Sequence, residues 1–202
     1  MRKVFFDVTF FNYHVNDEIV PFIINQQSYY RNTASTRRTG LEVGLKTHPV
    51  EGVEVTANYV YMDFRYEAYV ATVFGPSGTT TEDYSGNVVP SIPRHIVNFI
   101  LNYEFEISDD VSGLLQWDCD YIAKMYVDDR NSESTAGYFY GNIMAGANFG
   151  IFGTPATAYV GVNNIFDRRY AGFININDYY GRYYETGEPR MVYAGLKLSQ
   201  PL

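Results

Sequence analysis

Apolar and polar residues alternate along several stretches of this chain, and this period of two constrains the fold more than any other feature. The clearest stretch runs from Leu115 to Met125, where every second residue is apolar or aromatic and most residues between them are polar. Successive side chains of a strand point to opposite faces of its sheet, so this pattern predicts a strand with one apolar face. No stretch has the helical period, and none approaches the ~18 consecutive apolar residues of a transmembrane helix. The chain is predicted to be all-β.

About eight stretches carry the alternation, and the connections between them are short and long in turn. The predicted strands cover residues 4–12, 38–46, 53–61, 96–106, 115–125, 138–149, 156–163 and 191–198. Short turns are predicted at 48–52, 108–110 and 150–155, and long polar loops at 67–93, at 128–135 and after Asn163. A tilted membrane strand needs about 9–11 residues, and short turns facing long loops are typical of an antiparallel up-and-down transmembrane barrel.

Charge and cysteine content exclude several classes of protein. The net charge of −8 argues against a nucleic-acid partner, because phosphate binding requires a basic face. The single cysteine, Cys119, excludes a disulfide framework and a thiolate metal cluster. The acidic residues gather in the predicted loops and turns, and we expect them to be solvated there rather than to bind metal. They are Asp17-Glu18, Glu82-Asp83, Asp109-Asp110, Asp128-Asp129 and Glu133.

No arrangement of residues predicts catalysis. The three histidines, His14, His48 and His95, are scattered over a strand end, a turn and a loop edge. Asp118 and Asp120 share one strand face, but an ion pair with a residue such as Lys124 explains them without acid–base chemistry. We therefore expect no enzyme, no resident metal and no cofactor.

Blocks near both ends of the chain resemble one family. Residues 161–170 read GVNNIFDRRY and residues 193–196 read YAGL, with a Tyr- and Gly-rich loop between them. The run DEIVPF at 17–22 leads to TRRTGLE at 36–42. This succession is similar to that of the TonB-dependent outer-membrane receptors, whose last strands carry VNNLFD- and YAGL-like motifs.

The resemblance implies that residues 1–202 are the C-terminal segment of a receptor barrel. Such receptors close about 22 strands around a plug, which is more than this chain can supply. The segment is expected to contain no plug domain and no signal peptide, and to reach the outer membrane as part of a longer precursor. Two alternatives stay open, a small free-standing eight-stranded barrel and a truncated, non-functional receptor fragment. A passive pore and a soluble β-sandwich are weaker alternatives.

The resemblance also implies energised uptake of a scarce ligand, most often a ferric siderophore. The implied partners are the rest of the barrel and its plug, TonB acting through the missing N-terminal part, the ligand, and outer-membrane lipid. Anionic chelates would meet arginine and aromatic side chains of the long loops. The candidate ligand contacts are therefore Arg65, Arg130, Arg182 and Tyr183. Each arginine could instead be a solvated or paired charge, and the tyrosine could serve loop packing.

Overall fold

The computed structural model describes residues 4–24, 27–75, 78–178 and 180–199. Its strands are β1 Val4–Ile24, β2 Gln27–Thr47, β3 Val53–Ala68, β4 Val70–Gly75, β5 Gly78–Asp83, β6 His95–Ser108, β7 Val111–Ile122, β8 Tyr138–Ile151, β9 Thr154–Asn163, β10 Ala171–Ile174, β11 Tyr184–Thr186 and β12 Met191–Leu198. No helix in these ranges is long and apolar enough to cross a membrane. The all-β prediction is confirmed.

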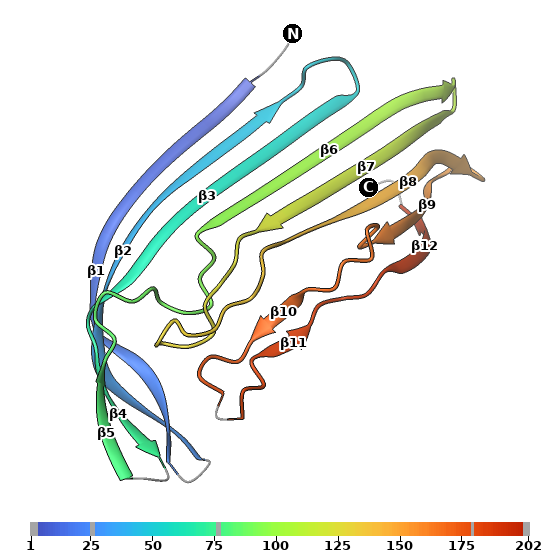
Figure 1. Cartoon of the computed structure of the whole chain (residues 1–202). Coiled ribbons are helices and arrows are strands. Elements are labelled where there is room, and N and C mark those ends of the chain that lie inside the picture. The colour runs from blue at the N-terminus through green and yellow to red at the C-terminus, as the bar shows by residue number, and fades with distance from the viewer. Residues whose placement is uncertain (1–3, 25–26, 76–77, 179, 200–202) are drawn as a thin grey trace.

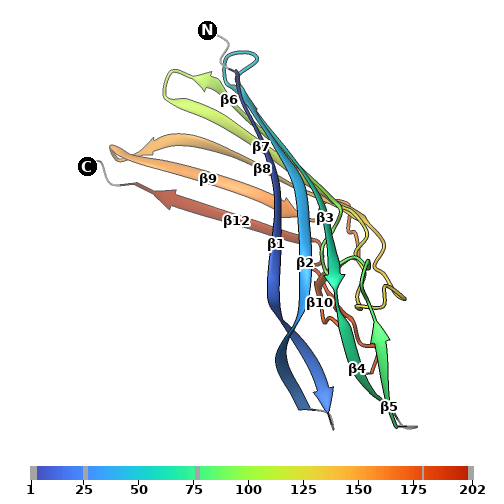
Figure 2. The ribbon, with the colours of Figure 1, turned by 90° about the vertical axis from the view of Figure 1, so that its left-hand side faces the viewer.

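Eight of the strands form one antiparallel sheet, in the order β1-β2-β3-β6-β7-β8-β9-β12. The sheet is open and curved, with β1 at one edge and β12 at the other, and the strand direction turns across it (Figures 1 and 2). Both termini lie at one end of the sheet, which we call the turn end (Figure 1). The two-stranded sheets β4-β5 and β10-β11 lie at the opposite end, which we call the loop end.

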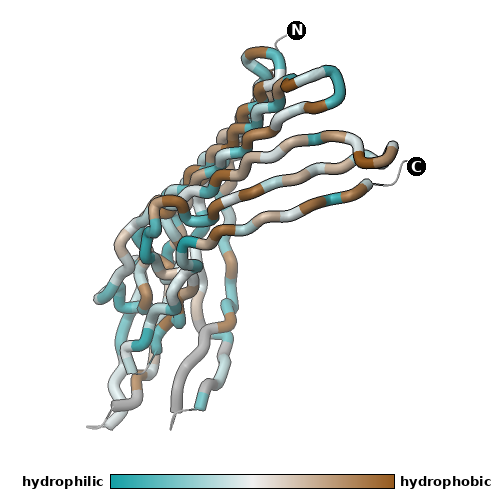
Figure 3. Tube along the Cα trace, turned by 90° about the vertical axis from the view of Figure 1, so that its right-hand side faces the viewer, coloured by the Kyte–Doolittle hydropathy of each residue, from teal (hydrophilic) through white to brown (hydrophobic). Residues whose placement is uncertain are grey.

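The register divides the sheet into an apolar face and a polar face. Phe99 on β6, for example, lies between Ala57 on β3 and Cys119 on β7, whereas its neighbour Asn98 lies between Asn58 and Asp120. Hydrophilic and hydrophobic residues accordingly alternate along the strands (Figure 3). The apolar face includes Val8, Phe10, Leu41, Val43, Tyr59, Val97, Phe99, Leu101, Trp117, Ile143, Val160, Val162, Val192 and Ala194. A barrel in a membrane turns such a face to lipid.

The first three strands are longer than the alternation predicts. β1 pairs with β2 as far as Ile24 and Gln27, although the predicted strands covered only 4–12 and 38–46. The register shifts between Val15 and Glu18, next to Asp17 with its φ of 57°. Backbone pairing thus continues beyond the apolar band, where side chains no longer need to alternate.

The long loops contain structure that the sequence pattern did not indicate. The β4–β5 hairpin lies in the predicted loop 67–93, and β10 and β11 pair within the loop after Asn163. Conversely, β7 ends at Ile122 and not at Met125. Met125 is only 8% exposed, because it packs with Val127 and Ile174 in a cluster under the loops.

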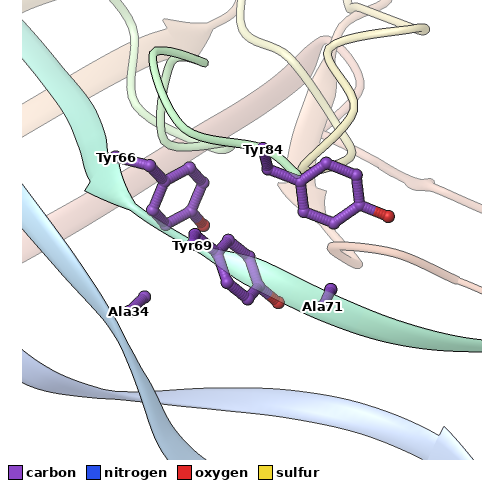
Figure 4. Packing of buried hydrophobic residues seen from close by; sticks show 5 residues of the cluster. All are labelled: Ala34, Tyr66, Tyr69, Ala71 and Tyr84. Atoms are coloured by element: carbon purple, nitrogen blue, oxygen red, sulfur yellow. The ribbon is translucent and has the colours of Figure 1, made fainter. Parts of the chain in front are cut away.

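A second buried cluster lies at the loop end. Its members are Ala34, Tyr66, Tyr69, Ala71 and Tyr84, contributed by β2, β3, β4 and the segments that follow β3 and β5 (Figure 4). The ring centres of Tyr66 and Tyr69 lie 4.7 Å apart, and those of Tyr69 and Tyr84 lie 5.2 Å apart. Among the described residues, the packed hydrophobic clusters therefore lie among the loops and not in the middle of the sheet.

Candidate functional site

Hydrogen bonds between polar side chains connect neighbouring strands on the polar face. Asn58 donates to Asn98 at 3.1 Å, and Asn98 donates to Asp120 at 2.9 Å. On the adjacent strands, Asn142 donates to the carboxylate of Asp118 at 2.7 Å. Polar groups in such ladders satisfy one another while leaving the face wettable, as the lumen wall of a barrel requires.

A second polar row lies nearer the turn end. Lys46 and His48 both contact the carboxylate of Glu54, at 2.8 and 3.1 Å. Further along the sheet, Thr157 donates to Asn148 at 2.7 Å, and Asn148 donates to Ser112 at 3.2 Å. The polar face is thus hydrogen-bonded across most of its width.

The ion pair predicted for Asp118 and Asp120 is wrong. Asn142 donates to Asp118 and Asn98 donates to Asp120, and β7 ends before Lys124, which takes that residue off the sheet. The Lys124 ammonium instead lies 5.1 Å from the centre of the Tyr126 ring.

The three histidines have separate hydrogen-bond partners. His14 contacts Glu67 at 2.7 Å, and His95 contacts the hydroxyl of Tyr59 at 2.9 Å. His48 contacts Glu54, as described above. Within the described ranges, no three His, Cys, Asp or Glu side chains are grouped so that they could hold a metal ion. The histidines therefore act as hydrogen-bond partners in three different places.

Tyrosines and glycines face each other where β9 pairs with β12. Tyr193 lies opposite Gly161, and Tyr159 lies opposite Gly195. A Cβ atom added at either glycine would overlap the facing tyrosine ring. The glycines of the GVNN and YAGL motifs therefore make room for rings that lie across the neighbouring strand.

Asn164 of the same motif fixes the start of the last long loop. The residue is 2% exposed and adopts a φ of 49°, which asparagine tolerates better than most residues. Its side-chain amide donates to the carbonyls of Arg168 and Glu188 at 2.9 and 3.0 Å, and its side-chain oxygen accepts from the Arg168 N–H at 2.9 Å. The Asn164 side chain thus joins the first turn of this loop, at Arg168, to the end of the loop, at Glu188.

Asp129 joins the three long loops. Its carboxylate accepts hydrogen bonds from the hydroxyls of Tyr66 and Tyr69 at 2.6 and 3.2 Å, and from the Asn177 amide at 2.8 Å. The Asn177 side-chain oxygen in turn accepts from the Asp129 N–H at 3.0 Å, and the Asn87 amide donates to the Asp129 carbonyl at 2.7 Å. These partners come from the end of β3 and the loop after it and from the last long loop, while Asp129 lies in the loop after β7. The three loops therefore form one assembly.

The prediction that Asp128 and Asp129 are solvated is wrong. They are 7% and 4% exposed, because the surrounding loops close over them. Burial raises the pKa of the Asp129 carboxyl, and the hydrogen bonds from Tyr66, Asn177 and Tyr69 oppose that shift. Asp128 accepts from the Ser132 N–H at 2.8 Å and holds a local turn.

A cleft of about 570 Å³ opens beside the loop end of the polar face. Tyr138, Tyr140 and Tyr170 line it, and their rings are stacked, with Tyr170 at 4.6 Å from Tyr138 and 5.2 Å from Tyr140. Polar groups of Asn142 and Glu185 also line the cleft. Such an aromatic wall with polar groups at its rim can contact a flat organic ligand. No local sequence pattern relates these three tyrosines, because Tyr170 lies in the last long loop, whereas Tyr138 and Tyr140 lie on β8.

The predicted ligand contacts lie in different parts of the loop end. Arg182 lies near the tip of the last loop, with 75% of its side chain exposed and Asp178 at 4.0 Å. Arg130 is bound by Glu82, with its Nε 2.7 Å from one carboxylate oxygen. Arg65 lies on the apolar-face side of β3, where it contacts Asp63 at 3.0 Å.

Tyr183 is part of the loop packing. It packs against the cluster of Met125, Val127 and Ile174, and its ring centre is 6.1 Å from that of Tyr184. Of the four predicted contacts, Arg182 has the most exposed charge, and the structure does not gather the four around one cavity. Asp129 and its partner Tyr66 were not among the predicted site residues, because they lie 63 residues apart and share no local pattern.

Comparison with known proteins gives the family. The family model described as "TonB dependent receptor-like, beta-barrel" matches residues 2–165. The ferrichrome outer membrane transporter/phage receptor of Escherichia coli K12 is 28% identical over 138 residues. That match covers 66% of this chain and 16% of the E. coli protein.

Solved receptors share the fold at low sequence identity. The siderophore receptor PiuA from Acinetobacter baumannii has a TM-score of 0.71 and 20% identity, over 96% of this chain and 26% of its own. The ferric citrate transporter FecA has a TM-score of 0.67 and 21% identity, over 95% of this chain and 28% of its own. The chain therefore spans about a quarter of the length of these receptors. As a family, the TonB-dependent receptors are Gram-negative outer-membrane transporters and not enzymes. The chain belongs to this family and forms part of its β-barrel.

Proposed function

We propose that this chain is the C-terminal segment of the barrel of a receptor that takes up a scarce ligand, most often a ferric siderophore, with energy delivered through TonB. The observation that carries the proposal is the assembly of three long loops above a hydrogen-bonded polar face, joined at Asp129. An organised set of loops over a wet wall suits capture of a bulky ligand before transport. The siderophore and ferric citrate receptors named above support the ligand class.

The ligand contacts that we propose are Arg182 first, then Tyr183, Arg130 and Arg65. Arg182 ranks first because its guanidinium is the most exposed of the three and has one carboxylate at 4.0 Å. An arginine in this state can bind a carboxylate or catecholate oxygen of an anionic chelate with paired hydrogen bonds. Arg130 and Arg65 would first have to leave Glu82 and Asp63.

Uptake of a radiolabelled ferric siderophore by iron-starved cells tests the proposal. The strain carries the complete receptor that contains this segment, and the variant is Arg182→Gln. We expect apparent affinity to fall by about tenfold, because one charge-assisted contact is worth about 1.5 kcal/mol or more. Lys197→Gln, which removes the same charge at the turn end of β12, is the control and should leave uptake unchanged.

Two results would count against the proposal. Equal uptake by wild-type cells and by cells lacking the receptor, across hydroxamate, catecholate and carboxylate siderophores, would exclude this ligand class. Equal loss in the Arg182 and Lys197 variants would show a general charge effect. The amount of receptor in the outer membrane is measured in every strain, so that poor assembly is not taken for poor binding.

The alternatives are a free-standing eight-stranded barrel and a truncated, non-functional fragment. The arrangement of the strands favours the larger barrel over the first, because β1 and β12 are at opposite edges of the described sheet and do not pair with each other. Cross-linking of cysteines introduced at facing positions of β1 and β12 decides between them. A β1–β12 cross-link in outer membranes would favour the small barrel. Receptor-dependent uptake separates the intact receptor from the truncated fragment.

A further inference from the structure

The cleft at the loop end of the polar face combines aromatic rings with carboxylates. We call it the tyrosine cleft, after Tyr138, Tyr140 and Tyr170, which line its volume of about 570 Å³. Its charged lining residues are Glu185 and Glu188, and no lysine, arginine or histidine is among the described residues that line it. The faces of an aromatic ring carry negative partial charge. Rings and carboxylates therefore give the cleft a negative potential together.

The carboxylates of the tyrosine cleft are not neutralised by ion pairs. Glu185 accepts a hydrogen bond from the neutral Asn175 amide at 3.3 Å. Within the described ranges, neither Glu185 nor Glu188 forms an ion pair, and both residues are exposed. A third carboxylate, that of Asp120, belongs to the residue opposite Tyr140 on the neighbouring strand. These carboxylates are therefore available to a cation that enters from outside.

Two arginines of the last loop line a different cleft. Arg168 and Arg169 line a cleft of about 420 Å³, which shares Tyr138, Tyr170 and Glu185 with the tyrosine cleft. Neither arginine lines the tyrosine cleft itself. The tyrosine cleft is therefore the acidic one of two neighbouring clefts, and the two differ in the charge of the group that each would attract.

The aromatic wall of the tyrosine cleft is fixed by contacts within the protein. The Gly187 N–H donates to the Tyr170 carbonyl at 2.9 Å, and a Cβ atom added at Gly187 would overlap the Tyr170 ring. The same ring stacks on Tyr138 and Tyr140, with interplanar angles of 24° and 7°. A wall that is ordered before the ligand arrives loses little conformational freedom on binding. The cleft is therefore a preformed site.

We propose that the tyrosine cleft binds a positively charged organic group, an ammonium or a guanidinium, carried by the ligand that the receptor takes up. This inference rests on the proposed uptake function and narrows the ligand to chelates with a free cationic arm. Aromatic faces attract such a cation, and carboxylates accept charge-assisted hydrogen bonds from it.

Other occupants fit the tyrosine cleft less well. An anionic arm would be repelled by Glu185 and Glu188, and no described cation lines the cleft to receive it. A bare metal ion is disfavoured, because among the described residues no three His, Cys, Asp or Glu side chains are grouped to hold one. An organic cation uses both the rings and the carboxylates.

Two ferric chelates that differ in one charge provide the test. Ferrioxamine B has a trihydroxamate iron core and a free pentylammonium arm, and N-acetylation of that arm removes its charge and leaves the core unchanged. Calorimetry measures the binding of both chelates to the complete receptor in detergent. We expect the acetylated chelate to bind about tenfold more weakly, because it loses one charge-assisted contact.

Variants of the cleft assign the difference to its residues. Glu185→Gln/Glu188→Gln removes two charges but keeps an acceptor oxygen at each position, and it should bind the two chelates equally. Glu51→Gln/Glu106→Gln, which changes two exposed acids at the turn end, is the control and should keep the tenfold preference. Tyr170→Phe keeps the ring and should keep the preference, whereas Tyr170→Leu should reduce it.

A second probe separates the cation site from iron uptake. Saturation-transfer NMR should detect the pentylammonium ion alone on the wild-type receptor, with a severalfold weaker signal on the Glu185/Glu188 variant and from neutral N-pentylacetamide. Equal signals from both probes, or binding of ferrioxamine B no tighter than that of its acetylated form, would overturn the proposal. Uptake of other ferric siderophores would then still support the uptake function. If no ferric chelate is taken up but pentylammonium binds as expected, the uptake function fails and the cation site stands.

Discussion

Asp129 is the residue on which the arrangement of the long loops depends most. It is buried, and every partner described for its carboxylate is a donor, namely the hydroxyls of Tyr66 and Tyr69 and the amide of Asn177. These partners lie between 48 and 63 residues away along the chain. A single side chain therefore connects three segments that the sheet itself leaves unconnected at this end.

Replacing Asp129 by alanine should loosen the three loops together. Tyr66 is 5% exposed, so its hydroxyl loses its acceptor inside the protein. A buried polar group without a partner costs about 1–3 kcal/mol. Hydrogen exchange of the complete receptor in lipid should show this loss of protection in residues 84–94, 126–137 and 175–178 together, with the sheet unchanged. Glu133→Ala, an exposed acid in the same loop, is the control; exchange that rises in one loop only would contradict the shared role of Asp129.

The pH dependence of this protection follows from the raised pKa of Asp129. A carboxyl whose pKa is higher in the folded state favours folding most when it is protonated. Its contribution is therefore fully present below its ordinary pKa and is lost as pH rises through the raised value. Asp129→Asn cannot titrate and should remove this part of the pH dependence, whereas Glu133→Gln should not.

The sequence could not indicate the burial of Asp129. The pair Asp128-Asp129 stands in a polar stretch beside Arg130 and Asn131, which locally is indistinguishable from a solvated loop. Its burial depends on tyrosines at the end of β3, and no local period relates positions so far apart. The same is true of Lys124, whose position depends on where β7 ends.

At the scale of the elements, the alternation predicted the membrane-spanning parts of the strands but not the strand pairs outside the membrane. The central parts of the eight main strands were predicted because each must present apolar side chains to one face. The outer part of β1 with β2, the β4–β5 hairpin and the β10–β11 pair are stabilised by backbone pairing outside that band. The hairpin β4–β5 and the pair β10–β11 lie in stretches that the sequence predicts as loops, because these stretches are rich in polar residues and glycine and lack the alternation.

The pairing of β9 with β12 makes a prediction at this scale. Gly161→Ala and Gly195→Ala should each destabilise the barrel by about 1–3 kcal/mol, the usual cost of overpacking, because the new methyl group meets Tyr193 or Tyr159. Gly150→Ala at the end of β8 is the control, since a Cβ there meets nothing within 4 Å. Heat-modifiable migration on gels and urea unfolding measure the difference.

A rescue variant distinguishes crowding from other effects of alanine. Gly161→Ala/Tyr193→Ala removes the ring that the methyl group meets and should recover part of the lost stability. If the double variant is as unstable as the sum of its two single variants, the facing ring is not the cause.

At the scale of the whole molecule, the two faces of the sheet require different environments. Ile100 and Leu101 are neighbours on β6, midway between His95 and Phe105, but Ile100 lies opposite Thr56 and Asp118, whereas Leu101 lies opposite Val55 and Trp117. The division between lumen and lipid therefore depends on a single residue step. The sequence pattern predicted this division along the central parts of the strands, because it is set there by alternation alone.

Arginine placed at each of these neighbours tests the assignment of the faces. Leu101→Arg should cost about 2–4 kcal/mol of barrel stability in lipid vesicles, the value for a cation on the lipid face near the midplane. Ile100→Arg should cost much less, because its side chain enters the polar face near Asp118. Urea unfolding in vesicles gives both values, and similar costs would mean that the faces are assigned wrongly or that the sheet is not in lipid.

The alternation of Tyr and Gly between β9 and β12 has a consequence for how the barrel is put together. A slip of one residue exchanges the faces and is opposed by the membrane, but a slip of two residues preserves them and is the error that hydrophobicity alone cannot prevent. Moving β12 by two residues would bring Tyr193 opposite Tyr159, or else Tyr193 opposite Asn163 and Gly195 opposite Gly161. The first places ring against ring, and the second leaves glycine facing glycine without a ring to cover it. The Tyr–Gly pairs therefore select the correct register of β9 and β12, since only that register places each ring over a residue without a side chain.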